Sequence, residues 1–107
     1  MRIAFTVDAA DPEAAVGAPF GRCKAFIVAD TRTGELQIVP NPAADRRTDA
    51  GVSTAGFIIA QKIDAVVSGS FGLNTSRMLA AAGIATYCLT AGSVCDFIDH
   101  LRNTPVT

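Results

Sequence analysis

The 107-residue chain contains no tryptophan, one tyrosine, one histidine and only three cysteines. The cysteines form no CxxC pair, so neither a zinc knuckle nor a disulfide framework is indicated. Apolar runs stay well below the ~18 residues of a membrane span, and the start of the chain lacks the pattern of a signal peptide. Nine basic residues against ten acidic ones leave a net charge of −1, which disfavours a nucleic-acid-binding module. We therefore expect a cytoplasmic protein with no nucleic-acid or membrane partner.

Half of the residues are hydrophobic, which suffices for one core at this length, and we expect a single domain over residues 1–107. The apolar pattern predicts the order strand-strand-strand-helix-strand-helix-strand-helix. The strands are expected at 2–8, 25–30, 36–39, 64–69 and 84–88. The first helix follows an N-cap at Thr48 or Asp49, the second covers about 73–82, and the third begins at Ser93. In the first helix, Val52, Ala55, Ile59 and Ile63 share one face.

The expected connections define one α/β topology. Strands 25–30 and 36–39 form an antiparallel hairpin whose turn contains Gly34. The later strand-helix-strand units require parallel pairing through right-handed crossovers. With the first strand in the centre, the order of the mixed five-stranded sheet is 3-2-1-4-5, with strand 2 antiparallel. The largely apolar strands 64–69 and 84–88 are expected to be buried.

This topology brings several loops to one edge of the sheet. The helices also begin there, and each helix N-terminus carries about half a positive charge with unpaired N–H groups. Arg22, Arg46 and Arg47 lie in the same loops. The turns there also contain Gly69, Gly72 and Gly92. These features predict an anion site, although the glycines are equally consistent with short strand-to-helix turns.

Several short motifs follow one another at a recognisable spacing. They are Val7-Asp8, Phe20-Gly21-Arg22, Asn41-Pro42, Ala50-Gly51, Asp64-Ala65-Val66-Val67-Ser68-Gly69, Phe71-Gly72-Leu73-Asn74 and Gly92-Ser93-Val94. In this order the chain resembles the dinitrogenase iron-molybdenum cofactor biosynthesis family along nearly its whole length. The resemblance implies a three-layer α/β/α, ribonuclease H-like fold. It also implies a non-enzymatic carrier or accessory protein of the nitrogenase type.

The cargo that the resemblance implies is an anionic metal–sulfur cluster of iron–molybdenum, iron–sulfur or molybdenum–copper type, delivered to a client metalloenzyme. The molybdenum–copper type is associated with the orange-protein branch of the family. Members often carry a histidine before Phe-Gly-Arg, where this chain has Pro19, and a His- and Gly-rich loop where it has residues 45–49. The only histidine, His100, lies on the last predicted helix, so thiolate, or charge and hydrogen bonds, must hold the cluster.

The candidate binding residues come from the loops at this edge. They are Arg22, Cys23, Arg46, Arg47, Ser70, Phe71, Gly72, Asn74, Thr90, Gly92 and Ser93. Cys23 and Cys95 are the candidate metal ligands, because soft thiolate suits such clusters and Arg22 and the helix ends should lower the pKa of Cys23. Plain packing is the alternative for both thiols.

Asp8 has no acidic partners for a nuclease site. A metal-free anion or phosphate-ligand module, or a domain docking on an oxidoreductase, are the competing functions.

Overall fold

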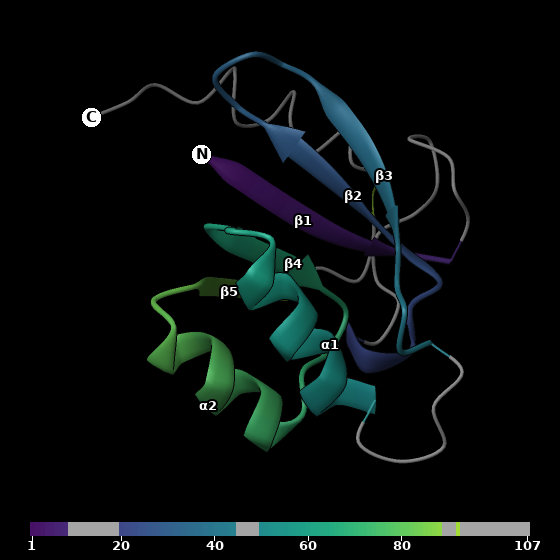
Figure 1. The fold of residues 1–107 in the computed structure, drawn as a ribbon, viewed down its shortest axis with the longest axis vertical. Helices are drawn as coiled ribbons and strands as arrows, with labels where there is room; N and C mark the ends of the chain where they lie inside the picture. Colours follow the sequence, from purple (N-terminus) through teal and green to yellow (C-terminus); the bar gives the residue numbers. More distant parts are fainter. Residues whose placement is uncertain (9–19, 45–49, 89–91, 93–107) are drawn as a thin grey trace.

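The computed structural model describes residues 1–8, 20–44, 50–88 and 92, and its centre is a five-stranded sheet in the order β3-β2-β1-β4-β5 (Figure 1). The strands are β1 (Arg2–Val7), β2 (Ala25–Asp30), β3 (Leu36–Pro40), β4 (Ala65–Ser68) and β5 (Ala85–Cys88). The helices in this part of the chain are the short 3-10 helix η1 (Phe20–Arg22), α1 (Ala50–Ala60) and α2 (Leu73–Ala81). The predicted α/β class and strand order are confirmed, and the third predicted α-helix, from Ser93, lies outside the described residues.

The central strand β1 fixes the rest of the sheet. It pairs antiparallel with β2, from Arg2 opposite Asp30 to Val7 opposite Ala25, and parallel with β4, where Ile3 lies opposite Ala65. Successive residues of a strand point to opposite faces. One face of β1 contributes Ala4 to a core cluster with α1 and α2, and the other contributes Ile3 and Phe5 to a second buried cluster. Burial on both faces accounts for the largely apolar sequence of this strand.

Both described α-helices pack on the same face of the sheet. Ala55 and Ile58 of α1 and Leu79 of α2 join Val66 of β4 in one core cluster. The end of α2 is closed as expected, because Gly83 takes a φ of 77° and the Ile84 N–H donates to the Leu79 carbonyl oxygen at 2.9 Å. None of the helices in the described ranges is both long and apolar enough to span a bilayer.

Two details of the predicted burial are wrong. Val52 and Ile59, expected on the buried face of α1, are 40% and 37% exposed, and Thr54 and Ile58 are buried in their place. This helix is apolar almost all round, so its periodicity does not single out one face. The residues of β5 are exposed, although we expected a buried strand. Among the described strands β5 lies at the edge of the sheet and pairs with β4 alone.

Candidate functional site

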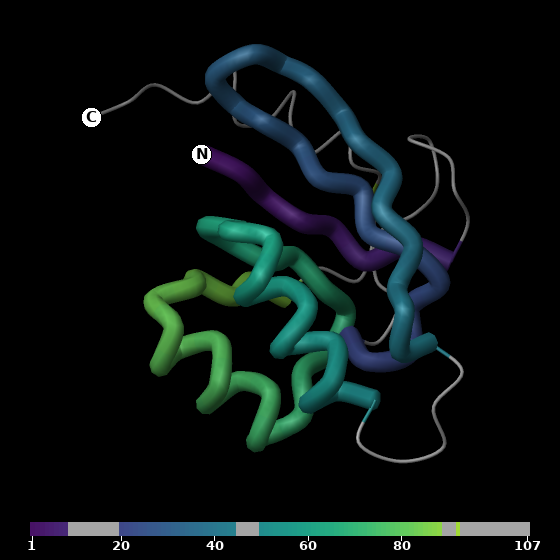
Figure 2. Tube along the Cα trace, in the orientation of Figure 1, coloured from purple at the N-terminus to yellow at the C-terminus, as the bar shows by residue number. Residues whose placement is uncertain are grey.

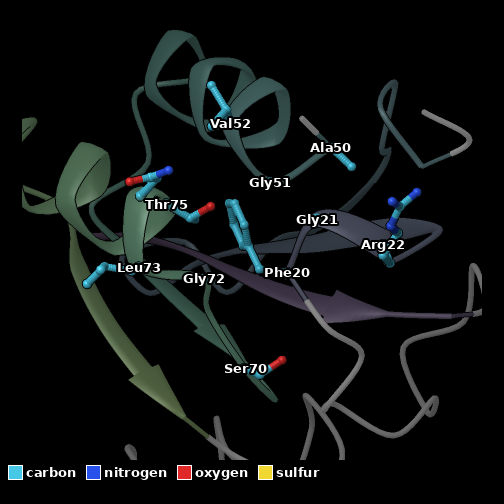
Figure 3. A pocket seen from close by; sticks show the side chains of 11 residues that line it. Phe20, Gly21, Arg22, Ala50, Gly51, Val52, Ser70, Gly72, Leu73 and Thr75 are labelled. Atoms are coloured by element: carbon cyan, nitrogen blue, oxygen red, sulfur yellow. The ribbon is translucent and has the colours of Figure 1, made fainter. Parts of the chain in front are cut away.

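A pocket of about 510 Å³ lies where η1 meets the starts of α1 and α2 (Figure 3). The Cα trace in Figure 2 shows these three segments gathered near the end of β4. The described lining residues are Phe20, Gly21, Arg22, Ala50, Gly51, Val52, Ser70, Gly72, Leu73, Asn74 and Thr75. Segments far apart in the sequence therefore form one concave site at the edge of the sheet where the anion site was predicted.

The wall made by η1 is held by backbone and ring contacts. The Phe20 N–H donates to the Ser70 carbonyl oxygen at 3.1 Å. The Phe20 ring lies 5.4 Å from that of Phe71 and 5.8 Å from that of Phe26, measured between centroids. Tilted aromatic pairs at such distances are attractive. These contacts attach η1 to the turn between β4 and α2.

Two glycines allow η1 to lie directly against α1. A Cβ atom on Gly21 would stand 2.6 Å from the Gly51 nitrogen and 2.7 Å from the Gly51 Cα. Both neighbours are backbone atoms, which cannot move aside as a side chain can. A side chain at residue 21 would therefore force η1 away from α1 and open the pocket wall.

The starts of both α-helices line the pocket. The N-cap of α2 is Gly72, which provides no side-chain hydrogen bond to the first turn. Neither α1 nor α2 has an acidic residue in its first turn. Helix N-termini carry partial positive charge and unpaired N–H groups, which suit anions. The exposed Arg22 adds a full positive charge at the rim.

Cys23 lies behind the pocket wall, within the protein core. Its side chain is 0% exposed, and its Sγ donates to the Phe20 carbonyl oxygen at 3.3 Å. Burial raises the pKa of this thiol to about 12, a hydrogen bond from Asn41 lowers it and the charge of Asp8 raises it further. The expectation that Arg22 and the helix ends lower this pKa is therefore wrong. The enclosed thiol is therefore protonated at neutral pH, and the role of Cys23 as a metal ligand stays a prediction.

The Asn41 side chain links Cys23, the residue that follows η1, to Thr54 of α1. Its Nδ2 donates to the Cys23 carbonyl oxygen at 2.9 Å and lies 3.6 Å from the Cys23 Sγ. Its Oδ1 accepts from the Ala43 N–H at 3.0 Å and from the Thr54 hydroxyl at 3.3 Å. We call Cys23, Asn41 and Thr54 the closed cluster. It fixes the residue that follows Arg22 to the middle of α1.

The candidate residues from the sequence divide into three groups. Arg22, Ser70, Gly72 and Asn74 line the pocket together. Cys23, Phe71 and Gly92 are not among the described lining residues. Cys23 is buried, the Phe71 ring contacts that of Phe20, and Gly92 has a φ of 95°. The candidates that lie outside the described residues are Arg46, Arg47, Thr90, Ser93 and Cys95.

Sequence reasoning did not single out Gly21, Gly51, Thr75 or the hydrogen bonds of Asn41. Gly21, Gly51 and Asn41 do belong to the family-like motifs quoted above, which was the available signal for them. For Thr75 there was none, because a threonine near a helix start is common and its burial depends on α1.

The chemistry of the described lining favours hydrogen bonding over metal coordination. Within residues 1–8, 20–44 and 50–88, His, Cys, Asp and Glu side chains form no group of three that could hold a metal ion. The described lining offers a guanidinium group, hydroxyls, an amide and backbone N–H groups. Such groups suit an anion that is bound through its outer atoms.

Comparison with protein families finds a match over residues 1–104 to the family described as dinitrogenase iron-molybdenum cofactor. Comparison with curated proteins finds no match.

Several solved structures are similar over most of their length. The apo form of the orange protein from Desulfovibrio gigas is 25% identical with a TM-score of 0.86, covering 99% of this chain and 92% of that one. A putative NifB protein from Thermotoga, placed in the DUF35 family, is 26% identical with a TM-score of 0.77 and coverages of 94% and 86%. A putative dinitrogenase from Methanocaldococcus jannaschii, at 16% identity, TM-score 0.67 and coverages of 94% and 86%, is similar in fold alone.

Proposed function

Because this chain belongs to the dinitrogenase iron-molybdenum cofactor family, we propose that it carries an anionic metal–sulfur cluster as cargo in the pocket between η1, α1 and α2. The proposal includes clusters of iron–molybdenum, iron–sulfur and molybdenum–copper type. One observation carries it: the starts of two helices and Arg22 line the same pocket. The structure is also similar to the apo form of the orange protein, and the resemblance to that branch of the family implies a cargo of the same class.

Charge and hydrogen bonds, rather than coordination, hold the cluster in this proposal. A helix N-terminus contributes about half a positive charge, and a guanidinium group adds a full charge with up to five N–H donors. Cys23 is protonated and enclosed, so its thiol is poorly suited to replace a sulfide ligand. A cluster held without covalent bonds can be transferred intact to a client metalloenzyme. The protein would thus act as a carrier without catalysing a reaction.

Anaerobic reconstitution tests the carrier function. The full chain is incubated with iron, sulfide, molybdate and copper in separate combinations, desalted, and examined for visible charge-transfer absorption and metal content. We expect a coloured complex with stoichiometric metal for at least one combination. Protein that stays colourless and metal-free in every mixture would overturn the proposal.

Three variants separate charge from coordination. Arg22→Ala should weaken cluster retention about tenfold, because a charge-assisted hydrogen bond at the rim is lost. Lys24→Ala, an equal change of charge at an exposed residue outside the described lining, should leave retention unchanged. Cys23→Ser should also retain the cluster. Loss of the cluster in Cys23→Ser with an intact fold would instead indicate coordination by the thiol.

A metal-free anion-binding module is the second candidate function. The lining residues that the structure describes carry many hydrogen-bond donors, and the same groups would bind phosphate or a phosphate-containing ligand. Thermal unfolding in metal-free buffer distinguishes the two. Stabilisation by phosphate-containing ligands without any cluster uptake would favour this module over the carrier.

A further inference from the structure

The floor of the pocket contains a buried hydroxyl group. Thr75, in the first turn of α2, lines the pocket and is only 4% exposed. Its Oγ1 lies 2.6 Å from the position that a Cβ on Gly51 would take, and 3.9 Å from that of a Cβ on Gly72. Figure 3 shows the side chain directed toward the space beside Phe20 and Gly51. The hydroxyl thus stands between the starts of the two helices.

The Thr75 hydroxyl forms no hydrogen bond with the residues that the structure describes. Thr54, which is also buried, donates its hydroxyl to Asn41 at 3.3 Å. Fully enclosed polar side-chain atoms in the described part of the chain all have a partner. The Thr75 oxygen is therefore not fully enclosed and opens into the pocket that it lines. Its hydrogen bond is left for the molecule that occupies the pocket.

Backbone donors lie in the same corner. The Ser76 N–H donates to the Gly72 carbonyl oxygen at 2.9 Å and forms the first bond of the α2 ladder. The amides of residues 73–75 precede that bond, and the Gly72 cap has no side chain to accept from them. The Thr75 hydroxyl and these amides together form a group of donors at the floor of the pocket, which we call the floor cluster.

We infer that the floor cluster binds the oxygen-bearing end of an anion, with the Thr75 hydroxyl donating directly to that oxygen. The ligand class is a tetrahedral oxyanion such as molybdate, or an oxo group that ends a larger cluster. Oxygen accepts hydrogen bonds from O–H and N–H groups more strongly than sulfur does. Gly51 leaves the hydroxyl accessible, since a single methyl group there would contact it. The inference rests on the proposed function, and it specifies that the oxygen-bearing end of the cargo lies at the floor of the pocket.

Titration calorimetry of the full chain with molybdate and with tetrathiomolybdate tests this inference. Thr75→Val, which keeps the shape and removes the donor, should weaken molybdate binding about tenfold or more. Its effect on tetrathiomolybdate should be about threefold or less, because a sulfur acceptor gains little from the hydroxyl. Thr75→Ser keeps the donor and should bind molybdate like the unaltered chain. Ser76→Ala, which removes a hydroxyl one residue outside the described lining, is the matched control and should change neither affinity.

The outcomes separate this inference from the carrier proposal. Equal binding of molybdate by Thr75→Val and the unaltered chain would overturn the inference, and so would equal weakening for both anions. Cluster uptake without any molybdate binding would also overturn it while leaving the carrier proposal intact. Thr75-dependent molybdate binding without cluster uptake would support the inference and contradict the carrier. Thermal melts confirm the fold of each variant, and Thr75→Ala replaces Thr75→Val if the valine variant does not fold.

Discussion

Two polar clusters lie beside α1 and differ in how their hydrogen bonds are satisfied. In the closed cluster, Asn41 bonds to the Cys23 backbone and to the Thr54 hydroxyl. In the floor cluster, the Thr75 hydroxyl and the first amides of α2 have no side-chain cap and open into a pocket. Buried polar groups that bond one another stabilise a fold, whereas donors left open suit a ligand. The first cluster stabilises the fold around the pocket, whereas the second offers hydrogen-bond donors to a ligand.

Replacing one asparagine of the closed cluster and one of the pocket lining gives the largest expected contrast. Asn41→Ala removes four contacts and leaves the Cys23 carbonyl, the Ala43 amide and the Thr54 hydroxyl without their partner. We expect a loss of about 3 kcal/mol in the free energy of unfolding. Asn74→Ala, at an exposed residue of the pocket, should change it by less than about 0.5 kcal/mol. Urea denaturation measures the free energy of unfolding of both variants. Similar losses would show that the hydrogen bonds of Asn41 stabilise the fold no more than the exposed Asn74 does.

The glycines of the pocket wall give the next largest effect. A methyl group on Gly21 would meet backbone atoms of Gly51, so Gly21→Ala should cost about 2 kcal/mol of stability and weaken anion binding. Gly56→Ala is the matched control, because nothing lies within 4 Å of its Cβ position on the exposed side of α1. That change should stabilise the protein by about 0.5 to 1 kcal/mol, since alanine favours helix. Thermal melts of the two variants measure these changes in stability. A Gly21→Ala variant as stable as the unaltered chain would contradict the close approach of η1 to α1.

The enclosed thiol of the closed cluster predicts a smaller, pH-dependent effect. Burial raises the pKa of Cys23 from 9.0 to about 12 in the folded chain. The unfolded chain releases its proton first, so stability is full below pH 9 and falls between pH 9 and 12. At pH 10 this loss amounts to about 1.4 kcal/mol. Cys23→Ala should abolish that part of the alkaline decline, which denaturation curves at pH 8 and pH 10 would reveal. An unchanged slope would contradict the assigned pKa.

The sheet could be derived from the sequence because its strands differ clearly in pattern. With the first strand taken as central, the hairpin turn with Gly34, the apolar run at β4 and the crossover rule predict the order β3-β2-β1-β4-β5 that the structure has. The same topology brought Arg22, Ser70, Gly72 and Asn74 to one edge, where the structure places them around one pocket. Each of these inferences depends on local signals or on general rules of chain connection.

The parts that sequence reasoning missed depend on contacts between distant segments. The burial of Thr75 requires the start of α1, and the raised pKa of Cys23 follows from enclosure by the core. The exposed faces of α1 and β5 are set by what packs beside them, which periodicity alone does not reveal. The predicted topology therefore located the site, whereas the protonation and accessibility of its groups required the folded chain.

The described lining of the pocket comes from three segments that the sheet alone does not hold together, namely residues 20–22, residues 50–52, and residue 70 with residues 72–75. A bound ligand that contacts all three segments stabilises the folded chain, and the gain rises with the logarithm of the ligand concentration above Kd. At a concentration of 100 times Kd that gain is about 2.7 kcal/mol. The melting temperature can therefore rank the affinities of ligands that have no visible absorption. A chain that has released its ligand unfolds more easily than one that still has it bound.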